Sequence, residues 1–458
     1  MKKENSGKQD LTAGSPFGVL LRFALPVIGG NLFQLFYTLA DSVIVGKTLW
    51  ANALAAVGST SIIIYFVLCF IQGFTNGLGI CLGQRFGAKD RDGMKKSIAA
   101  SVVLCLGITV VITLVCCMFS WEILDMMKTP EDIRAQAYEY MFVVLLGTGA
   151  TVFYNMISNI LRALGDSRTP LYFLVFSSVL NVILDLVFIV PLKMGVAGAA
   201  WATVLSQLAA AVCCLAAGLQ SFETLHLCTA DFQGMGKQMQ FHLKTAFPMG
   251  FQMSVMCIGQ LAMQAAVNAL GTAAVAGYTA ATKADQVSVL VNNAMGTAIS
   301  NYVAQNYGAG QMERIKKGVR AALIQTEALN VMMCAGILLL REPLVSLFIT
   351  EPSAEIVRYS NGYLQVVAPF YVILGLLLVY RTTIQSMQNA AAPFAACMIE
   401  LAMRIGSTMI LVKVVGYTGV ALASPLAWIG ACLLLIPVYY RMERGKNKRG
   451  KSREKIAE

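Results

Sequence analysis

Charged residues and histidine are scarce in this sequence, and each shortage excludes a class of protein. Asp, Glu, Lys and Arg make up 13% of the residues, whereas soluble domains carry about 25%. Two histidines, His226 and His242, are too few for a histidine-rich metal site. No complete nucleotide-binding loop is present, so we expect no transport driven by ATP hydrolysis in this chain. Because 57% of the residues are hydrophobic, we expect an all-α integral membrane protein.

Cysteine is present without any sign of a metal site. The twelve cysteines lie mostly within apolar runs and lack metal-ligand spacing, so we expect small buried side chains. The net charge of +11 does not indicate a nucleic-acid partner, because the basic residues gather on one side of the predicted membrane. Residues 1–16 are polar and lead directly into an apolar run, so we expect no cleavable signal peptide. These features predict a multi-pass monomer in the cell membrane, surrounded by lipids and without a cofactor.

Apolar runs of at least about 18 residues predict the membrane spans. Most basic residues outside the runs fall in the even-numbered connections and in the C-terminal tail, so both termini are expected in the cytoplasm. The twelve predicted spans are 17–46, 53–83, 97–120, 133–162, 170–191, 195–219, 240–270, 275–304, 318–340, 355–388, 393–413 and 419–440.

Two copies of one motif indicate an internal repeat of six spans. The stretch GQRFGAKDRDGMKKSI (83–98) recurs as AQNYGAGQMERIKKGV (304–319), and Pro26 pairs with Pro248. An even number of spans in each copy predicts parallel lobes, related by an axis along the membrane normal. The predicted parts are a cytoplasmic tail, a first lobe, a cytoplasmic linker, a second lobe and a basic cytoplasmic tail, at 1–16, 17–219, 220–239, 240–440 and 441–458.

The first span carries an acid, Asp41, in an otherwise apolar stretch. A charge within a membrane costs at least about 2.5–3.5 kcal/mol, so such residues usually face a protein interior or water and serve a function. Gln34 and Thr38 share a helix face with Asp41, and Tyr37 lies beside that face. Pro26 removes one backbone hydrogen bond earlier in the same span. We therefore predict an ion site at Asp41, a cavity lining around it and a hinge at Pro26.

Further polar residues in the first lobe could complete this site. Asn181 and Asp185 are one turn apart in the fifth span, and Thr203 lies in the sixth. Two carboxyl groups with nearby oxygen and amide groups suit either a proton or Na⁺, because burial favours the neutral carboxyl group and oxygen ligands suit a hard cation. Asn155 and Asn159 of the fourth span are further candidates. The alternative is that these groups only hold helices together by hydrogen bonds.

The second lobe has a different set of polar residues. The position that matches Asp41 falls near Ala262 or Met263, so no acid is present there. Gln260 and Gln264 share one face of the seventh span and are predicted to line the cavity. Glu400 and Arg404 are four residues apart in the order that favours an ion pair, so we predict a structural pair. Asp285 and Arg381 are also predicted cavity residues, and Arg381 or Glu400 could be partners of Lys283 or Asp285.

Taken together, these motifs resemble the multidrug and toxin extrusion (MATE) family. The residues that carry the resemblance are LPVIGG and DSVIVG in the first span, the repeated GQRFGA and AQNYGA, LRALGDSRTP after the fourth span, and MGVAGAAWAT. The resemblance implies two lobes in a V around a central cavity, and efflux of amphipathic organic cations in exchange for H⁺ or Na⁺. In DinF-like members, the coupling ion is bound by acids that match Asp41 and Asp185, by an Asn and a Thr that match Asn181 and Thr203, and by an Asn that matches Asn155 or Asn159. NorM-like members bind Na⁺ through acids on the seventh and tenth helices, and here the tenth carries Arg381.

Two other functions compete with efflux of drugs. A flippase for lipid-linked precursors would belong to the same superfamily, but such proteins typically have more spans and a strongly basic cavity. A membrane enzyme would need a nucleophile–base pair or a metal cluster within the spans, and none is evident in the sequence. We therefore predict a transporter rather than an enzyme.

Overall fold

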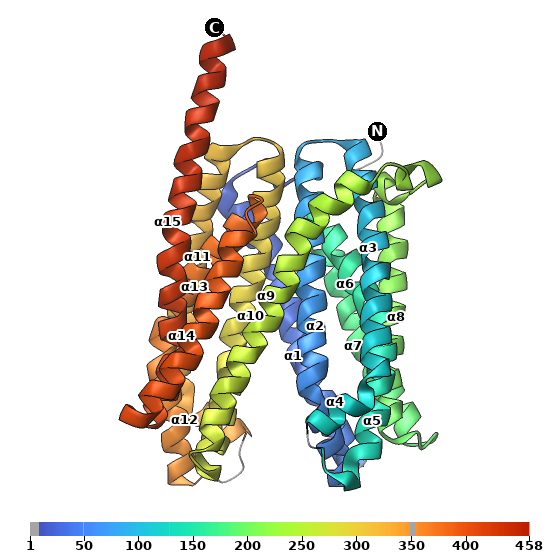
Figure 1. Cartoon of the computed structure of the whole chain (residues 1–458), viewed down its shortest axis with the longest axis vertical. Helices are drawn as coiled ribbons and strands as arrows, with labels where there is room; N and C mark the ends of the chain where they lie inside the picture. Colours follow the sequence, from blue (N-terminus) through green and yellow to red (C-terminus); the bar gives the residue numbers. More distant parts are fainter. Residues whose placement is uncertain (1–8, 49, 128, 349–352, 458) are drawn as a thin grey trace. The chain divides into compact units, whose positions relative to one another are not determined.

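The computed structural model of this chain contains only helices as regular secondary structure in the ranges that it describes. It describes residues 9–48, 50–127, 129–348 and 353–457, and it describes side chains over these ranges except within 36–55, 344–348 and 445–457. The helices are shown in Figure 1. In chain order they are α1 (Pro16–Thr48), α2 (Trp50–Gly87), α3 (Arg91–Met118), α4 (Ser120–Met126), α5 (Glu131–Leu146), α6 (Thr148–Ala163), α7 (Arg168–Ile189), α8 (Gly195–Ser221), η1 (Glu223–Leu225), η2 (Thr229–Phe232), α9 (Gly236–Asn268), α10 (Thr272–Gly308), α11 (Met312–Phe348), α12 (Ala354–Val367), η3 (Ala368–Phe370), α13 (Tyr371–Ser386), α14 (Ala391–Val415) and α15 (Tyr417–Ala457).

Every predicted span coincides with one of these helices or with consecutive helices. The fourth span is α5 followed by α6, with a bend of 40° between them, and the tenth is α12, η3 and α13. In the described ranges, ten helices are long and apolar enough to cross a membrane, and the bent pair makes an eleventh. The predicted span 275–304 is the long helix α10, which carries polar residues along much of its length. The all-helical membrane fold is therefore confirmed.

The chain divides into two compact units. Unit 1 comprises Leu25–Ser254 with the segment that ends at Asp10, and unit 2 comprises Leu11–Ala24 with Val255–Glu458. The main boundaries between the units fall inside α1 and α9. The predicted lobes and linker stay a prediction.

Close backbone contact explains why the first part of α9 belongs to unit 1. A Cβ atom on Gly77 of α2 would lie 2.4 Å from the Cα atom of Ala246, and one on Gly73 would lie 2.3 Å from the carbonyl oxygen of Met249. Only glycine permits such an approach. In addition, Ser254 donates a hydrogen bond to the carbonyl oxygen of Phe66 at 3.2 Å. The first half of α9 is thus packed directly onto α2.

The N-terminal segment joins unit 2 through the second copy of the repeated motif. Gln305 accepts a hydrogen bond from the backbone N–H of Leu11 at 3.1 Å, and the Asn306 amide donates to the Leu11 carbonyl at 3.0 Å. The Arg314 guanidinium donates to the carbonyls of Ala13 and Gly14, at 2.7 Å each. The AQNYGA copy therefore holds the chain that precedes the first span.

An apolar core fixes the helices that carry the polar residues of unit 1. It includes Phe74 and Leu82 of α2, Ile98 of α3, Leu161 of α6 and Cys214 of α8, all of them buried. Removing apolar surface from water stabilises a protein by roughly 25 cal/mol per Å². Inside a membrane this term is absent between helices, and close van der Waals packing holds them together instead. The core sets the rotation of α6 and α8, and thereby which of their polar residues face α7.

Candidate functional site

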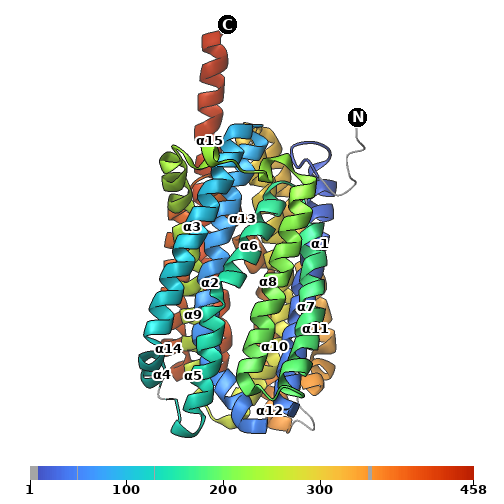
Figure 2. The same ribbon diagram turned by 90° about the vertical axis from the view of Figure 1, so that its right-hand side faces the viewer.

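The polar residues predicted in the fifth and sixth spans come together between α7 and α8, which run side by side (Figure 2). Asp185 is fully buried and Asn181 is 1% exposed. With the Asn181 amide oriented so that both of its polar atoms are satisfied, Nδ2 lies 3.3 Å from Asp185 Oδ2 and Oδ1 lies 3.2 Å from the backbone nitrogen of Thr203. The Thr203 hydroxyl donates to the Ala199 carbonyl at 3.1 Å. We call Asn181, Asp185 and Thr203 the α7–α8 cluster.

The sequence brings these residues together through a short turn and a close helix contact. Lys193 (φ 50°) and Gly195 (φ 59°) adopt left-handed backbone conformations between α7 and α8, which reverses the chain. At Gly198, a Cβ atom would lie 3.1 Å from the Cβ atom of Phe188, so the two helices start in near contact. Asn181 and Asp185 then face α8 together, because residues four apart share a helix face.

Helix α6 adds polar groups to the same face of α8. The Thr151 hydroxyl donates to Gln207, which lies one turn after Thr203. Asn155 lies one turn after Thr151 and donates to its carbonyl at 2.9 Å. The polar face of α8 is therefore shared between α6 and α7, and Asn155 lies on the side of α6 that contacts α8.

Asn159, the alternative candidate on the same helix, has a different role. Its amide donates to Thr75 of α2 at 3.2 Å, and a Cβ atom on Gly79 would lie 3.3 Å from the Asn159 Cβ atom. Asn159 is 6% exposed. It therefore packs α6 against α2, which leaves Asn155 as the better candidate for the ion site.

The predicted residues of the first span are only partly covered by the structure. The side chains of Tyr37, Thr38 and Asp41 lie outside the described side chains. Gln34 is exposed, and Pro26 lies inside helix α1, which continues through it to Thr48. A joint site of Asp41 with the α7–α8 cluster therefore stays a prediction.

In unit 2 the predicted ion pair of Glu400 with Arg404 is wrong. Glu400 of α14 forms an ion pair with Arg381 of α13, and both side chains are 3% exposed. Arg404 is 6% exposed, and its Nε atom has no hydrogen-bond partner among the described residues. Packing explains the difference, because Arg404 lies against Gly259 of α9, where a Cβ atom would be 3.0 Å from its Cδ atom. Arg381 is consequently a structural partner of Glu400 rather than of Asp285.

The other predicted cavity residues of unit 2 do not form one group. Asp285 accepts a hydrogen bond from the Tyr371 hydroxyl at 2.6 Å, and Lys283 is exposed. Gln260 is exposed, and Gln264 donates to Asn268 at 2.9 Å along one face of α9. Gln264 and Asn268 thus lie on the same face of α9. The partner of Asp285 is Tyr371, which no pattern in the sequence singled out.

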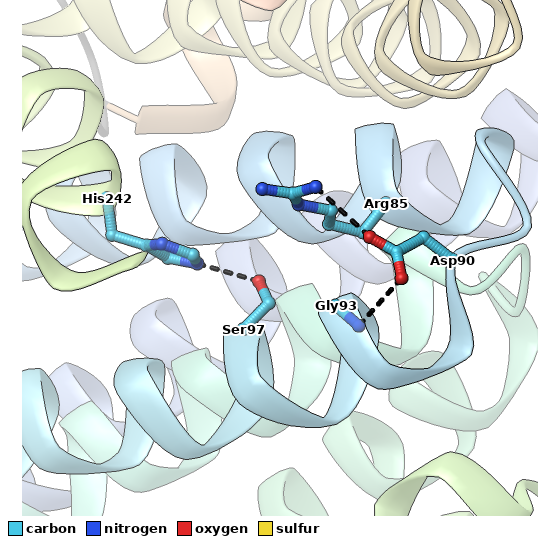
Figure 3. Close-up of polar contacts among 5 residues, drawn as sticks. All are labelled: Arg85, Asp90, Gly93, Ser97 and His242. Carbon is cyan, nitrogen blue, oxygen red and sulfur yellow. Dashed lines mark hydrogen bonds and ion pairs between the residues drawn. The ribbon is translucent and has the colours of Figure 1, made fainter. Parts of the chain in front are cut away.

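A serine–histidine pair in unit 1 was also missed by sequence reasoning (Figure 3). Ser97 Oγ of α3 lies 2.7 Å from His242 Nε2 of α9, and His242 Nδ1 lies 2.7 Å from the Gln238 carbonyl oxygen. A carbonyl only accepts, so Nδ1 carries the proton and Nε2 accepts from Ser97. Figure 3 also shows the neighbouring pair of Arg85 and Asp90, at 3.1 Å.

The burial of Ser97 and His242 indicates that this pair has a structural role. Ser97 is fully buried and His242 is 1% exposed, so neither reacting atom could reach a substrate. No group of three or more His, Cys, Asp or Glu residues in the described part of the chain could hold a metal ion. The pair therefore ties α3 to the first part of α9.

Comparisons with known proteins match both halves of the predicted repeat. A family model described as MatE matches residues 26–187 and 248–410. The "Probable multidrug resistance protein YpnP" of Bacillus subtilis (strain 168) is 32% identical over 444 residues, covering 95% of this chain and 97% of that relative. The "FAD transporter" of Shewanella oneidensis is 23% identical and covers 94% of this chain and 95% of that relative. The structure described as "Crystal structure of MATE in complex with MaL6" has a TM-score of 0.90 at 23% identity and covers 97% of this chain and 100% of that one.

Proposed function

Because this chain belongs to the MatE family of membrane transporters, we propose that it exports amphipathic organic cations in exchange for an inward-moving cation, either H⁺ or Na⁺. Membership rests on the family model, which matches most of both repeat copies, and on a relative that is 32% identical along nearly the whole chain. Related proteins named for multidrug resistance or export support small drug-like substrates. The chain is thus a multi-pass transporter and not an enzyme.

The α7–α8 cluster is the observation that carries the proposed coupling. Asp185 is fully buried within a helix that crosses the membrane, and a buried carboxylate is costly unless a cation or a proton balances it. The Asn181 amide lies beside this carboxyl group, and Thr203 lies next to Asn181. Such a site can hold a proton or a cation and release it later. Asp41 and Asn155 are the residues that we propose to complete it.

The proposed mechanism is alternating access driven by that site. From the outer side, H⁺ or Na⁺ neutralises the acids, which weakens the attraction for a bound organic cation and allows it to leave. The first helix then rearranges about Pro26, and the two lobes expose the site to the cytoplasm, where the ion is released. A coupling ion must bind the two states with different affinity, since otherwise it shifts neither of them.

Transport in proteoliposomes tests this proposal. A pH gradient and a Na⁺ gradient are imposed separately, and accumulation of a fluorescent organic cation is followed. We expect one gradient to drive accumulation against the substrate gradient, and Asp185→Asn to reduce it to background while folding is retained. Glu139→Gln, an exposed acid on α5, is the matched control and should transport normally.

Two results would contradict the proposal. If neither gradient drives accumulation by correctly folded wild-type protein, coupling to H⁺ or Na⁺ is wrong. If Asp185→Asn transports at the wild-type rate, the α7–α8 cluster only packs helices. Normal elution and melting temperature of the variant are required before either conclusion is drawn.

An anionic substrate is the second candidate, favoured by Arg404. This guanidinium is 6% exposed and forms no ion pair within the described part of the chain. A relative at 23% identity is named as an FAD transporter. Competition decides between the two: a flavin nucleotide should not inhibit uptake of the organic cation if the first proposal holds.

Scrambling of a fluorescent lipid-linked phosphate would instead support the flippase predicted as the alternative.

A further inference from the structure

A buried carboxyl group in unit 2 lies outside the proposed coupling site and has no use in it. This group is Glu327 of α11, and both of its carboxyl oxygen atoms are buried. The Asn330 amide is a neutral hydrogen-bond donor beside this carboxyl group, and Glu327 forms no ion pair among the described residues. An ionised carboxylate in such surroundings is strongly unfavourable, because burial without a charged partner forfeits its solvation.

The space for this carboxyl group is created by a glycine on the facing helix. A Cβ atom on Gly375 of α13 would lie 2.7 Å from Glu327 Oε1, 2.3 Å from Asn330 Nδ2 and 3.0 Å from Thr326 Cγ2. Any larger residue at Gly375 would therefore occupy the position in which the carboxyl group sits. Glu327 is held in a fitted recess between α11 and α13.

The polar groups around the recess are neutral, and the Asn330 amide is a donor beside the carboxyl group. The Asn330 amide donates to the Tyr371 carbonyl at 2.9 Å, and its oxygen accepts from Asn292 at 2.7 Å. Thr326, which is 1% exposed, has a hydroxyl without a hydrogen-bond partner in the described chain. The Asn292 carbonyl oxygen, in a residue that is also 1% exposed, lacks one as well. These two side-chain oxygen atoms are acceptors that lack a donor in the described chain, so neither supplies a donor that would stabilise a carboxylate.

No positively charged side chain among the described residues forms an ion pair with Glu327. The titratable groups near this region are Asp285 of α10, Cys334 of α11, Tyr363 of α12, Tyr371 of α13 and Cys432 of α15. Arg381 also lies near Cys432, where its charge is balanced by Glu400. The buried cations of unit 2 have other neighbours. Arg381 pairs with Glu400, and Arg404 and Asp285 both interact with the Tyr278 side chain.

We propose that Glu327 is a second proton-binding group of this protein, located in unit 2 and separate from the α7–α8 cluster. In the structure described here its carboxyl group is protonated, and it takes up or releases one proton when unit 2 changes its access to water. No other reactant is involved, since the step is the reversible association of H⁺ with a carboxylate oxygen. If the proposed antiport is correct, this proton adds to the ions exchanged for each substrate.

Infrared difference spectroscopy on the full chain in lipid nanodiscs tests this without any transport measurement. Spectra are recorded between acidic and alkaline buffer for wild type and for Glu327→Gln, which mimics the shape of the protonated acid. We expect a carboxyl C=O band, at the position of an acid with few hydrogen bonds, to disappear in Glu327→Gln. Glu355→Gln, an exposed acid on α12, and Asp185→Asn should both retain it.

The outcomes separate this proposal from the proposed function. Retention of the whole band in folded Glu327→Gln overturns it, whether or not Asp185 couples transport. Loss of the band supports it even if the proteoliposome experiment fails.

Carbodiimide labelling of the wild-type chain needs no variant: mass spectrometry should find Glu327 modified, with less modification as the pH rises. Failure to modify Glu327 at any pH, while other membrane acids react, would overturn the proposal as well.

Discussion

Buried carboxyl groups of this chain differ in how their charge is balanced, and the difference lies in single neighbours. Asp185 lies beside the Asn181 amide, and Asp285 accepts from the Tyr371 hydroxyl. Glu400 faces a guanidinium, that of Arg381. A carboxylate beside a cation is fixed as an ion, whereas one beside neutral groups is open to exchange of a proton or a cation. At the scale of residues, this distinguishes Glu400, which is ion-paired, from Asp285, which accepts from a neutral hydroxyl group.

The Arg381–Glu400 pair is expected to behave as a structural unit. Replacing either residue alone with leucine should destabilise the protein by about 3–5 kcal/mol, because the partner is left as an uncompensated buried charge. Replacing both together should cost less than either single change. Apparent melting temperatures in detergent, measured for both single variants and for the double variant, check this.

Arg404 provides the control for this experiment. Arg404→Leu combined with Glu400→Leu should show no such relief, since Glu400 pairs with Arg381 instead. If the loss of stability in the double variant of Arg381 and Glu400 equals the sum of the losses in the two single variants, the two residues do not act as a pair. Relief in the Arg404 combination would restore the ion pair that the sequence spacing suggested.

At the scale of elements, glycine decides which helices touch. Gly73 and Gly77 of α2 are where α9 approaches at backbone distance. The same stretch contains Gly79, which borders Asn159 of α6. Small residues permit such contacts in membranes, where association depends on close packing rather than on exclusion of water. Helix α2 is therefore held between α6 and the first part of α9.

Substitution of Gly77 tests this packing. In Gly77→Ala, the new Cβ atom would lie 2.4 Å from the Ala246 Cα atom, so the helices must separate. We expect a loss of about 1–3 kcal/mol, the usual cost of overpacking. The measurement is the apparent melting temperature of the purified protein.

Gly107→Ala is the matched control, because Gly107 lies within α3 and an added Cβ atom would meet no atom within 4 Å. Alanine favours helix over glycine by about 1 kcal/mol, so this variant should be as stable as wild type or slightly more stable. Equal melting temperatures for both variants would mean that α9 does not pack on α2 as described.

At the scale of the whole molecule, orientation in the membrane follows from the distribution of basic residues. The connections with Arg85, Lys95, Arg314 and Lys316, together with the C-terminal tail, carry most of the positive charge. The positive-inside rule predicts that they lie in the cytoplasm. The direction of the proposed export depends on this orientation.

A native cysteine reports on the orientation. Cys228, between α8 and α9, is exposed, whereas the other eleven cysteines are buried or half-buried. A membrane-impermeant maleimide should label Cys228 in inverted vesicles and leave it unlabelled in intact cells. In a Cys228→Ser background, Glu131→Cys at the start of α5 should show the opposite pattern. The reverse result for both positions would invert the topology and the direction of transport.

The sequence by itself determined the membrane-spanning helices, their pairing into a repeat and the positions of most buried acids. A spanning segment has no water to bond with in the membrane core, so its backbone N–H and C=O groups must bond to each other, which a helix achieves within the segment. Helix formation is therefore determined by the local sequence. The α7–α8 cluster was also predictable, because Asn181 and Asp185 lie four residues apart and α8 follows α7 after a short turn.

Only the tertiary structure decided which partner each buried group meets. Periodicity shows that Glu400 and Arg404 share a helix face, yet α13 brings Arg381 to Glu400 and α9 takes up Arg404. In the same way, Asn159 meets Thr75 of α2. The recess of Glu327 depends on Gly375, which lies 48 positions further along the chain (375 − 327). Such contacts join residues that are distant in sequence, and their choice depends on the rotation and spacing of whole helices, which packing fixes and local sequence does not.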